Sequence, residues 1–201
     1  ILHRLKVDWM INFEEIELNA LNAVNKNCFP YEEAALHNTR KVIKAFRKHK
    51  VSDYYLKPTT GYAYSDVGRE KLDLIYADIF HAEAALVRSQ FVSGTHALAV
   101  ALLGVLRQGD EIISATGTPY DTMQTIIGFP VKTPGSLVDI GVSYKEVPMS
   151  GSKVAIKELQ SAITPKTRMV LIQRSCGYSD ARKTLTVAAI GEICQAVKTI
   201  N

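Results

Sequence analysis

Four residues, Ser93-Gly94-Thr95-His96, indicate how this chain folds. They follow an apolar run over residues 84–91 that predicts a strand, and they precede a helical pattern over residues 97–107. A glycine turn between a strand and a helix presents unpaired backbone N–H groups and the positive end of the helix dipole, so it can hold a phosphate. Ordinary turn and capping chemistry also explains the same residues, and this corner alone leaves both interpretations open.

Beyond this corner, helical and strand patterns alternate. Strands are expected over residues 111–116, 144–149 and 169–174, and helices over residues 121–127, 153–163 and 187–200. Such alternation predicts an α/β fold with a mostly parallel sheet and helices on both of its faces. Ligands bind at the carboxyl ends of the strands in sheets of this kind. Three loops belong to that edge, namely residues 93–96, 116–121 and 173–178.

The residues before the corner predict a helical N-terminal arm. A helical pattern over residues 7–28 is expected to break at Pro30, and a second helix is expected over residues 32–49. Residues 52–66 form a predicted loop rich in tyrosine, and Asp66 is placed to cap a helix over residues 67–80.

These patterns divide the chain into two predicted parts. Residues 1–66 form the arm and the tyrosine loop, and residues 67–201 form the first half of a larger domain. The chain begins at Ile1 without a methionine and ends at Asn201 just after a predicted helix, so we expect a fragment of a longer protein.

The composition is that of a globular protein in a reducing compartment. Of the 201 residues 47% are hydrophobic and 22% are charged, and the net charge of +4 is spread along the chain, which disfavours a nucleic-acid partner. The three cysteines, Cys28, Cys176 and Cys194, form no metal or disulfide pattern. No apolar run reaches the roughly 20 residues that span a membrane. We therefore expect a cytoplasmic protein without a metal site.

Tyr120 follows the predicted strand over residues 111–116 and lies at the ligand edge. Its ring suits a flat aromatic ligand, and packing on the following helix is the alternative. An aromatic ring beside a phosphate corner is typical of a site for a phosphorylated planar cofactor.

Five segments, taken in order, resemble the pyridoxal-phosphate enzymes of cysteine and methionine metabolism. They are GYAYSDVGRE (61–70), AEAAL (82–86), SGTHA (93–97), SATGTPYD (114–121) and IQRSCGY (172–178). More narrowly, they resemble the branch called the methionine gamma-lyase family or aluminium-resistance proteins. The likeness spans nearly all of the chain.

The resemblance implies a fold-type I large domain like that of aspartate aminotransferase, with pyridoxal 5'-phosphate as cofactor. Its phosphate would lie on the backbone of Gly94 and Thr95, beside Ser93, and Tyr120 would stack on its ring. Tyr62 or Tyr64 would reach the phosphate of a neighbouring subunit in a homodimer or homotetramer, with ordinary loop packing as the alternative.

Further residues acquire roles through the same resemblance. His96 could stack or hydrogen-bond near the cofactor, or simply fill space in the first turn of a helix. Gln173 and Arg174 would lie near the cofactor or the substrate carboxylate, and Arg174 suits carboxylate pairing because a guanidinium offers two parallel donors. A surface ion pair is the alternative for Arg174. The Schiff-base lysine and the aspartate facing the pyridine nitrogen would come after Asn201.

The function implied is elimination at the β or γ carbon of a sulfur-containing amino acid by a carbon–sulfur lyase, of which this chain holds half the site. An aminotransferase or another fold-type I enzyme would use the same phosphate corner and ring. A binding module of the same fold without catalysis is a third alternative.

Overall fold

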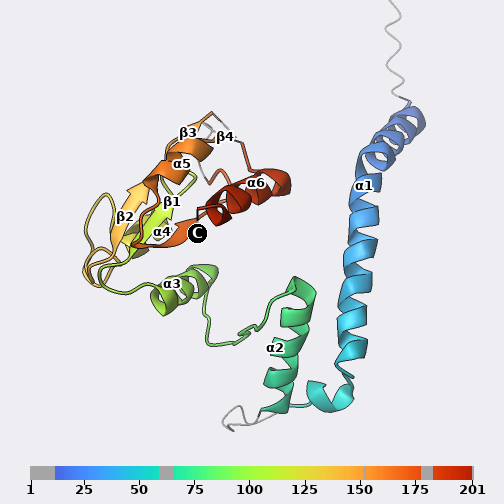
Figure 1. Cartoon of the computed structure of the whole chain (residues 1–201). Helices are drawn as coiled ribbons and strands as arrows, with labels where there is room; N and C mark the ends of the chain where they lie inside the picture. Colours follow the sequence, from blue (N-terminus) through green and yellow to red (C-terminus); the bar gives the residue numbers. More distant parts are fainter. Residues whose placement is uncertain (1–11, 59–65, 152, 178–182, 201) are drawn as a thin grey trace, which may run out of the picture. The chain divides into compact units, whose positions relative to one another are not determined.

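The computed structural model describes residues 12–58, 66–151, 153–177 and 183–200 (Figure 1). The described residues fall into two units, one that ends at Ser89 and one that begins at Gln90. Each unit is described by itself. The helix that begins at Val67 packs on the long helix of the first unit, and the predicted division of the chain at residue 67 stays a prediction.

The first unit begins with one long helix, α1 (Phe13–Lys48). The side chain of Asn12 caps it by accepting a hydrogen bond from the backbone N–H of Glu15 at 3.2 Å. The expected break at Pro30 is wrong, because the backbone of α1 is helical on both sides of it. A proline inside a helix removes one backbone hydrogen bond and costs about 3 kcal/mol. The helix formers Glu32, Glu33, Ala34, Ala35 and Leu36 follow it directly and favour continuation.

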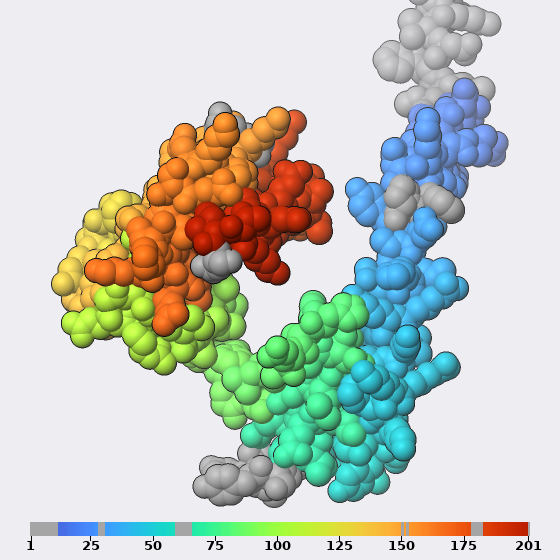
Figure 2. Space-filling view, in the orientation of Figure 1, coloured from blue at the N-terminus to red at the C-terminus, as the bar shows by residue number. Residues whose placement is uncertain are grey.

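Much of α1 is uncovered by other described residues. The side chains of Phe13, Ile16 and Leu21 are 75%, 55% and 51% exposed, and Figure 2 shows this part of the helix in blue. At its C-terminal end α1 contacts α2 (Val67–Phe80). The Asp78 carboxylate lies 2.5 Å from Lys48 Nζ and 3.4 Å from Nε2 of His49, the residue that follows α1.

The predicted cap of α2 is confirmed. The Asp66 carboxylate accepts from the backbone N–H of Arg69 at 3.1 Å, and α2 has the predicted bounds. A short 3₁₀ helix, η1 (Asp53–Leu56), lies in the segment that was expected to be a loop.

The strand expected over residues 84–91 is absent, and this prediction is wrong. The backbone N–H and carbonyl of Val87 bond to side chains instead of to a neighbouring strand. Asp73 accepts from the Val87 N–H at 2.8 Å and from Arg88 Nη1 at 2.7 Å, and Arg88 Nη1 also donates to the Val87 carbonyl at 2.8 Å. A side chain of α2 thus takes the place that a neighbouring strand would fill.

The second unit is an α/β layer structure. Its elements are α3 (Gly94–Val105), β1 (Glu111–Ser114), α4 (Asp121–Ile127), β2 (Ser143–Glu146), β3 (Met149–Ser150), β4 (Lys153–Val154), α5 (Ile156–Ala162), β5 (Thr167–Leu171) and α6 (Val187–Lys198). Strands β2, β1 and β5 form a parallel sheet in that order. The sequence predicted the parallel sheet but not the order of its strands. The antiparallel pair β3 and β4 was not predicted, and it delays the helix expected from residue 153 until Ile156.

The core lies on both faces of β1, whose four residues are all buried. Ile112 packs on one face with Leu102 of α3 and Met123 of α4, and Ile113 packs on the other with Leu159 of α5 and Ile193 of α6. Successive side chains of a strand point to opposite faces, so this one short strand joins both clusters. Helices therefore cover both faces, as the sequence predicts.

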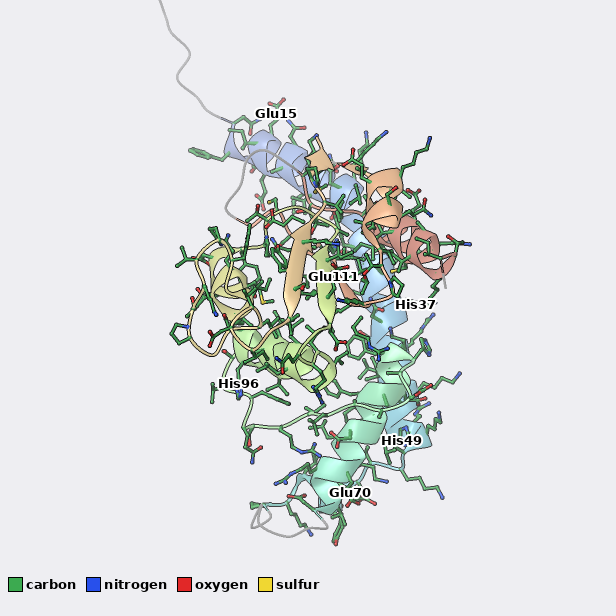
Figure 3. The ribbon with its side chains drawn as sticks, turned by 60° about the vertical axis from the view of Figure 1, so that its left-hand side comes forward. Glu15, His37, His49, Glu70, His96 and Glu111 are labelled. Atoms are coloured by element: carbon green, nitrogen blue, oxygen red, sulfur yellow. The ribbon has the colours of Figure 1, made fainter. Side chains whose placement is uncertain are left out.

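One charged residue is buried in the sheet. Glu111, labelled in Figure 3, opens β1 and is 5% exposed. Its carboxylate pairs with Lys145 Nζ at 2.7 Å and accepts from the hydroxyls of Thr167 at 2.7 Å and Thr164 at 3.0 Å. Burial raises the pKa of Glu111, but Lys145 and the two hydroxyls outweigh it and leave the pKa below its ordinary value.

Candidate functional site

The carboxyl ends of the three parallel strands meet at one edge of the sheet. Ser114, the last residue of β1, lies opposite Glu146 of β2 and Leu171 of β5 in the strand register. The loops that leave these strands therefore begin side by side. Two of the three loops expected to form a site, residues 116–121 and 173–178, belong to this edge, and of the second the structure describes residues 173–177.

Gln173 joins these two loops through its side chain and its backbone. Its Oε1 accepts from the backbone N–H of Tyr120 at 3.0 Å, and its Nε2 donates to the Ser175 carbonyl at 3.2 Å. Its own backbone N–H donates to Thr116 Oγ1 at 3.1 Å. Thr116 is 2% exposed, so this last bond lies inside the protein.

Tyr120 lies just before α4, between the sheet edge and the core. It is half-buried, and its side chain packs against the cluster that contains Met123 and Ile127. Both interpretations of this tyrosine thus retain support, because the ring touches the core and remains partly accessible. Gly177 of the other loop lies beside it: a Cβ added there would be 3.9 Å from Tyr120 Cβ and 3.5 Å from Gln173 Nε2.

A second set of hydrogen bonds connects the loop over residues 116–121 to β2. The Glu146 carboxylate accepts from the Thr118 hydroxyl at 2.9 Å and from the Tyr144 hydroxyl at 2.8 Å. Burial, and after it the Glu146 carboxylate, raises the pKa of Tyr144, so its hydroxyl stays protonated and donates. Sequence reasoning missed these residues. The available signal was the polar pair Tyr144 and Glu146, two positions apart on a predicted strand that ends at the ligand edge.

The corner before α3 has the geometry of a capped helix start. Ser93 Oγ accepts from the backbone N–H of His96 at 3.1 Å. Among the described residues, the backbone N–H groups of Gly94 and Thr95 have no hydrogen-bond partner. A Cβ added at Gly94 would meet no atom within 4 Å, so the space beside this turn is open. Two backbone donors therefore lie at the positive end of a 12-residue helix.

His96, labelled in Figure 3, lies in the first turn of α3 and is exposed. Its ring contacts that of Phe91 edge to face at 5.7 Å between centroids, and Nδ1 accepts from the Val92 N–H at 3.4 Å. These contacts brace the segment before the helix. Both roles considered for His96 stay predictions.

Arg174 is exposed, and its Nε donates to the Leu185 carbonyl at 3.2 Å. That bond ties the loop after β5 to the residues before α6. Tyr62 and Tyr64 lie outside the described residues, so their predicted role at a neighbouring subunit stays a prediction. In the part of the chain that the structure describes, no three His, Cys, Asp or Glu residues are grouped to hold a metal ion. Likewise, no described helix has the length and apolar character to cross a membrane.

Comparison with known proteins assigns the chain to a family. The sequence profile of the methionine gamma-lyase family matches residues 13–201. The uncharacterised protein YnbB of Bacillus subtilis is 45% identical over 172 residues, which cover 85% of this chain and 41% of YnbB.

Solved structures agree with this assignment. A protein from Listeria innocua, provisionally assigned as a cystathionine beta-lyase involved in aluminium resistance, is 40% identical with a TM-score of 0.89, over 96% of this chain and 47% of that one. The carbon–sulfur lyase involved in aluminium resistance from Clostridium novyi is 34% identical with a TM-score of 0.85, over 93% of this chain and 45% of that one. The chain thus spans somewhat less than half the length of these relatives. On its sequence and on its fold, the chain belongs to the methionine gamma-lyase family.

Proposed function

We propose that this chain carries the N-terminal half of the cofactor site of a pyridoxal-phosphate-dependent carbon–sulfur lyase. The observation that carries the proposal is the pair of loops, after β1 and after β5, that Gln173 joins beside the ring of Tyr120 at the carboxyl edge of the sheet. Ligands of α/β sheets bind at this edge. Membership of the methionine gamma-lyase family supplies the reaction class.

The residues present fit the phosphate of the cofactor. Gly94 and Thr95 offer two unpartnered N–H groups at the start of α3, next to open space. Ser93 fixes that turn because its hydroxyl caps the helix. A dianion placed there would accept hydrogen bonds from both donors and would gain from the helix dipole.

The residues present also fit the ring of the cofactor. Tyr120 presents a half-buried aromatic side chain whose backbone is fixed by Gln173 and whose loop is fixed by Glu146. A flat heterocycle stacked on that ring would cover its accessible side. When bound, pyridoxal phosphate acts as an electron sink for the carbanion formed at the substrate Cα.

The residues of this chain would bind and orient rather than transfer protons. We assign the carboxylate of an amino-acid substrate to Arg174, whose Nε is engaged by Leu185 while the residue as a whole is exposed. The lysine that binds the cofactor covalently and the aspartate that faces its ring nitrogen are assigned to the rest of the protein. A fold-type I large domain beginning at residue 67, assembly as a homodimer or homotetramer, and a phosphate contact from Tyr62 or Tyr64 of a neighbouring subunit belong to the same proposal.

A lyase is favoured over an aminotransferase by the names of the relatives. The protein from Clostridium novyi is named a carbon–sulfur lyase, and the matching family profile is that of methionine gamma-lyase. The substrate class follows from these names: an amino acid that carries sulfur at its β or γ carbon.

The test uses the natural full-length protein. Its visible absorption is recorded before and after borohydride reduction, and we expect a yellow band that reduction removes. Cystathionine, cysteine and methionine are then supplied separately, and ammonia and a keto acid are measured. Their release without an added acceptor supports elimination, whereas dependence on an added keto acid supports transamination. A protein that stays colourless with added pyridoxal phosphate would overturn the proposal in favour of a binding module.

A further inference from the structure

Gln173 connects two loops that are distant in sequence. Its side-chain oxygen accepts from Tyr120, 53 residues away, and its backbone N–H donates to Thr116, 57 residues away. Its side-chain nitrogen donates to the nearby Ser175 carbonyl. One residue therefore spans the ends of β1 and β5.

The bond to Tyr120 restrains the backbone from which the ring of Tyr120 projects. Pro119 has no N–H, so the Tyr120 N–H is the first backbone donor of the loop after Thr118. Tyr120 is the residue that precedes α4, and its backbone is extended (φ −64°, ψ 160°) before the helix begins. Holding the N–H at this point restrains the backbone of Tyr120 and so fixes the direction of its Cα–Cβ bond, while packing on the core cluster restrains the ring.

The amide of Gln173 is suited to this role and poorly suited to binding a substrate directly. The sequence led us to expect contact with the cofactor or the substrate carboxylate, yet its oxygen and its nitrogen both bond to backbone groups of the protein. An amide carries an acceptor oxygen and a donor nitrogen on one planar group, so it can accept from the loop after β1 and donate to the loop after β5 at the same time.

We infer that Gln173 is a positioning residue, which holds Tyr120 so that its ring lies parallel to a flat cofactor at the sheet edge. This inference rests on the proposed function. It adds that affinity for pyridoxal phosphate depends on a residue that does not touch it. Removing the amide frees the Tyr120 backbone, so the ring must be ordered when the cofactor binds, and affinity falls.

The experiment compares Gln173→Met, which keeps the length of the side chain, with Gln160→Met as a matched control. Gln160 Nε2 donates to the Ala196 carbonyl at 3.1 Å and thus joins α5 to α6 away from the loops after β1 and β5. Both substitutions remove a half-buried amide that connects two segments. A third variant, Gln173→Glu, keeps the oxygen that accepts from Tyr120 but loses the donor to Ser175.

Two quantities are measured in the full-length protein. The first is hydrogen exchange of the Tyr120 backbone amide without cofactor, which we expect to rise about tenfold in Gln173→Met and to stay unchanged in Gln160→Met. The second is the dissociation constant of pyridoxal phosphate, which we expect to rise about tenfold in Gln173→Met only. Gln173→Glu is expected to fall between the wild type and Gln173→Met in both.

The outcomes separate the inference from the proposed function. Unchanged exchange at Tyr120 in Gln173→Met overturns the inference, whatever the cofactor does. Faster exchange with unchanged affinity also overturns it, because the ring would then be positioned without Gln173 or would play no part in binding. If the wild type binds no pyridoxal phosphate, the proposed function fails. Faster exchange of the Tyr120 amide in Gln173→Met would then support only the hydrogen bond between Gln173 and Tyr120.

Discussion

At the scale of single residues, a few buried polar groups and close contacts contribute to the free energy of unfolding of the second unit. Glu111 is the charged residue among them, and it lies at the opposite end of β1 from the candidate site. A buried carboxylate is tolerated only when it is paired and hydrogen-bonded. Lys145 and the hydroxyls of Thr164 and Thr167 meet this requirement. Glu111 therefore contributes to the stability of the fold and is not part of the candidate site.

The Glu111→Gln substitution tests this role through pH. The pKa of Glu111 is lowered in the folded protein, so its contribution is fully present above the ordinary pKa of 4.5 and is lost as pH falls through the lowered value. We expect the variant to lose about 2 kcal/mol of stability at pH 7, and to lose less below about pH 4. Urea unfolding of both proteins from pH 3 to pH 7 measures this. A difference that stays constant over that range would contradict it.

Gly128 illustrates a steric constraint at one residue. It ends α4 with φ +83°, and a Cβ there would lie 2.7 Å from Ser136 Cβ and closer still to Ser136 Oγ. Ser136 is 5% exposed and has little room to move. Gly135 has a similar φ of +78° but nothing within 4 Å of an added Cβ, so it is the matched control.

Gly128→Ala is therefore expected to cost about 3–5 kcal/mol, and Gly135→Ala about 1–2 kcal/mol. The control carries backbone strain alone, whereas Gly128→Ala adds overlap with Ser136. Chemical denaturation of the two variants gives the comparison. Equal losses would mean that the loop after α4 adjusts to the added methyl group.

At the scale of elements, the segment after α2 is held by side chains rather than by a sheet. Asp73 accepts from the Val87 N–H and from Arg88, and the Arg88 guanidinium lowers the pKa of Asp73.

Asp73→Ala should release this segment. We expect the Val87 amide to exchange hydrogen about ten times faster, because it loses its acceptor. Asp78→Ala is the control on the same helix, since Asp78 pairs instead with Lys48, the last residue of α1, and with His49, which follows it. Hydrogen exchange with mass spectrometry can resolve the two effects. Equal protection of Val87 in all three proteins would show that other contacts hold the segment.

Elements with strong local signals were predictable from sequence. The bounds of α2 and α4 agree with the prediction, and so does the parallel sheet, because caps and alternating patterns are local features. Two failures have physical reasons. Pro30 alone predicts a break, but the helix formers that follow it favour continuation. The apolar pattern at 84–91 predicts a strand, but it does not show that the Val87 N–H finds its acceptor on α2.

The candidate site was predictable only in part. Ser93, Gly94, Tyr120 and Gln173 could be found because glycine turns and strand ends mark them in the sequence. The contacts between the loops could not be predicted from the sequence. The bond from Gln173 to Tyr120 spans 53 residues, and that from Thr118 to Glu146 spans 28, and no local pattern specifies either.

At the scale of the whole molecule, the three-stranded sheet has β2 and β5 at its edges. Among the described residues, the outer side of β5 has no strand partner, and the apolar side chains of Met169 and Val170 line a hollow there with Cys194 of α6. The relatives are more than twice as long as this chain. Experiments on ligand binding therefore belong with the full-length protein.

Cofactor binding should appear as a gain in stability of that whole protein. A ligand that binds only the folded state at 100 times its dissociation constant adds about 2.7 kcal/mol, and each tenfold loss of affinity removes about 1.4 kcal/mol of this. Tyr120→Phe keeps the ring and should keep the thermal shift caused by pyridoxal phosphate, whereas Tyr120→Ala should lose at least half of it. Tyr120 also packs on the core, so Tyr120→Ala lowers the melting temperature without cofactor as well.

The shift on adding pyridoxal phosphate, rather than the melting temperature itself, is thus the quantity that decides. Met169→Ala is the matched control, since Met169 packs against the same core cluster as Tyr120 but lies on β5, before the loops of the site. It should melt lower and still show the full shift. A full thermal shift in Tyr120→Ala would contradict a role for the ring in the site, because the cofactor would then bind equally well without it.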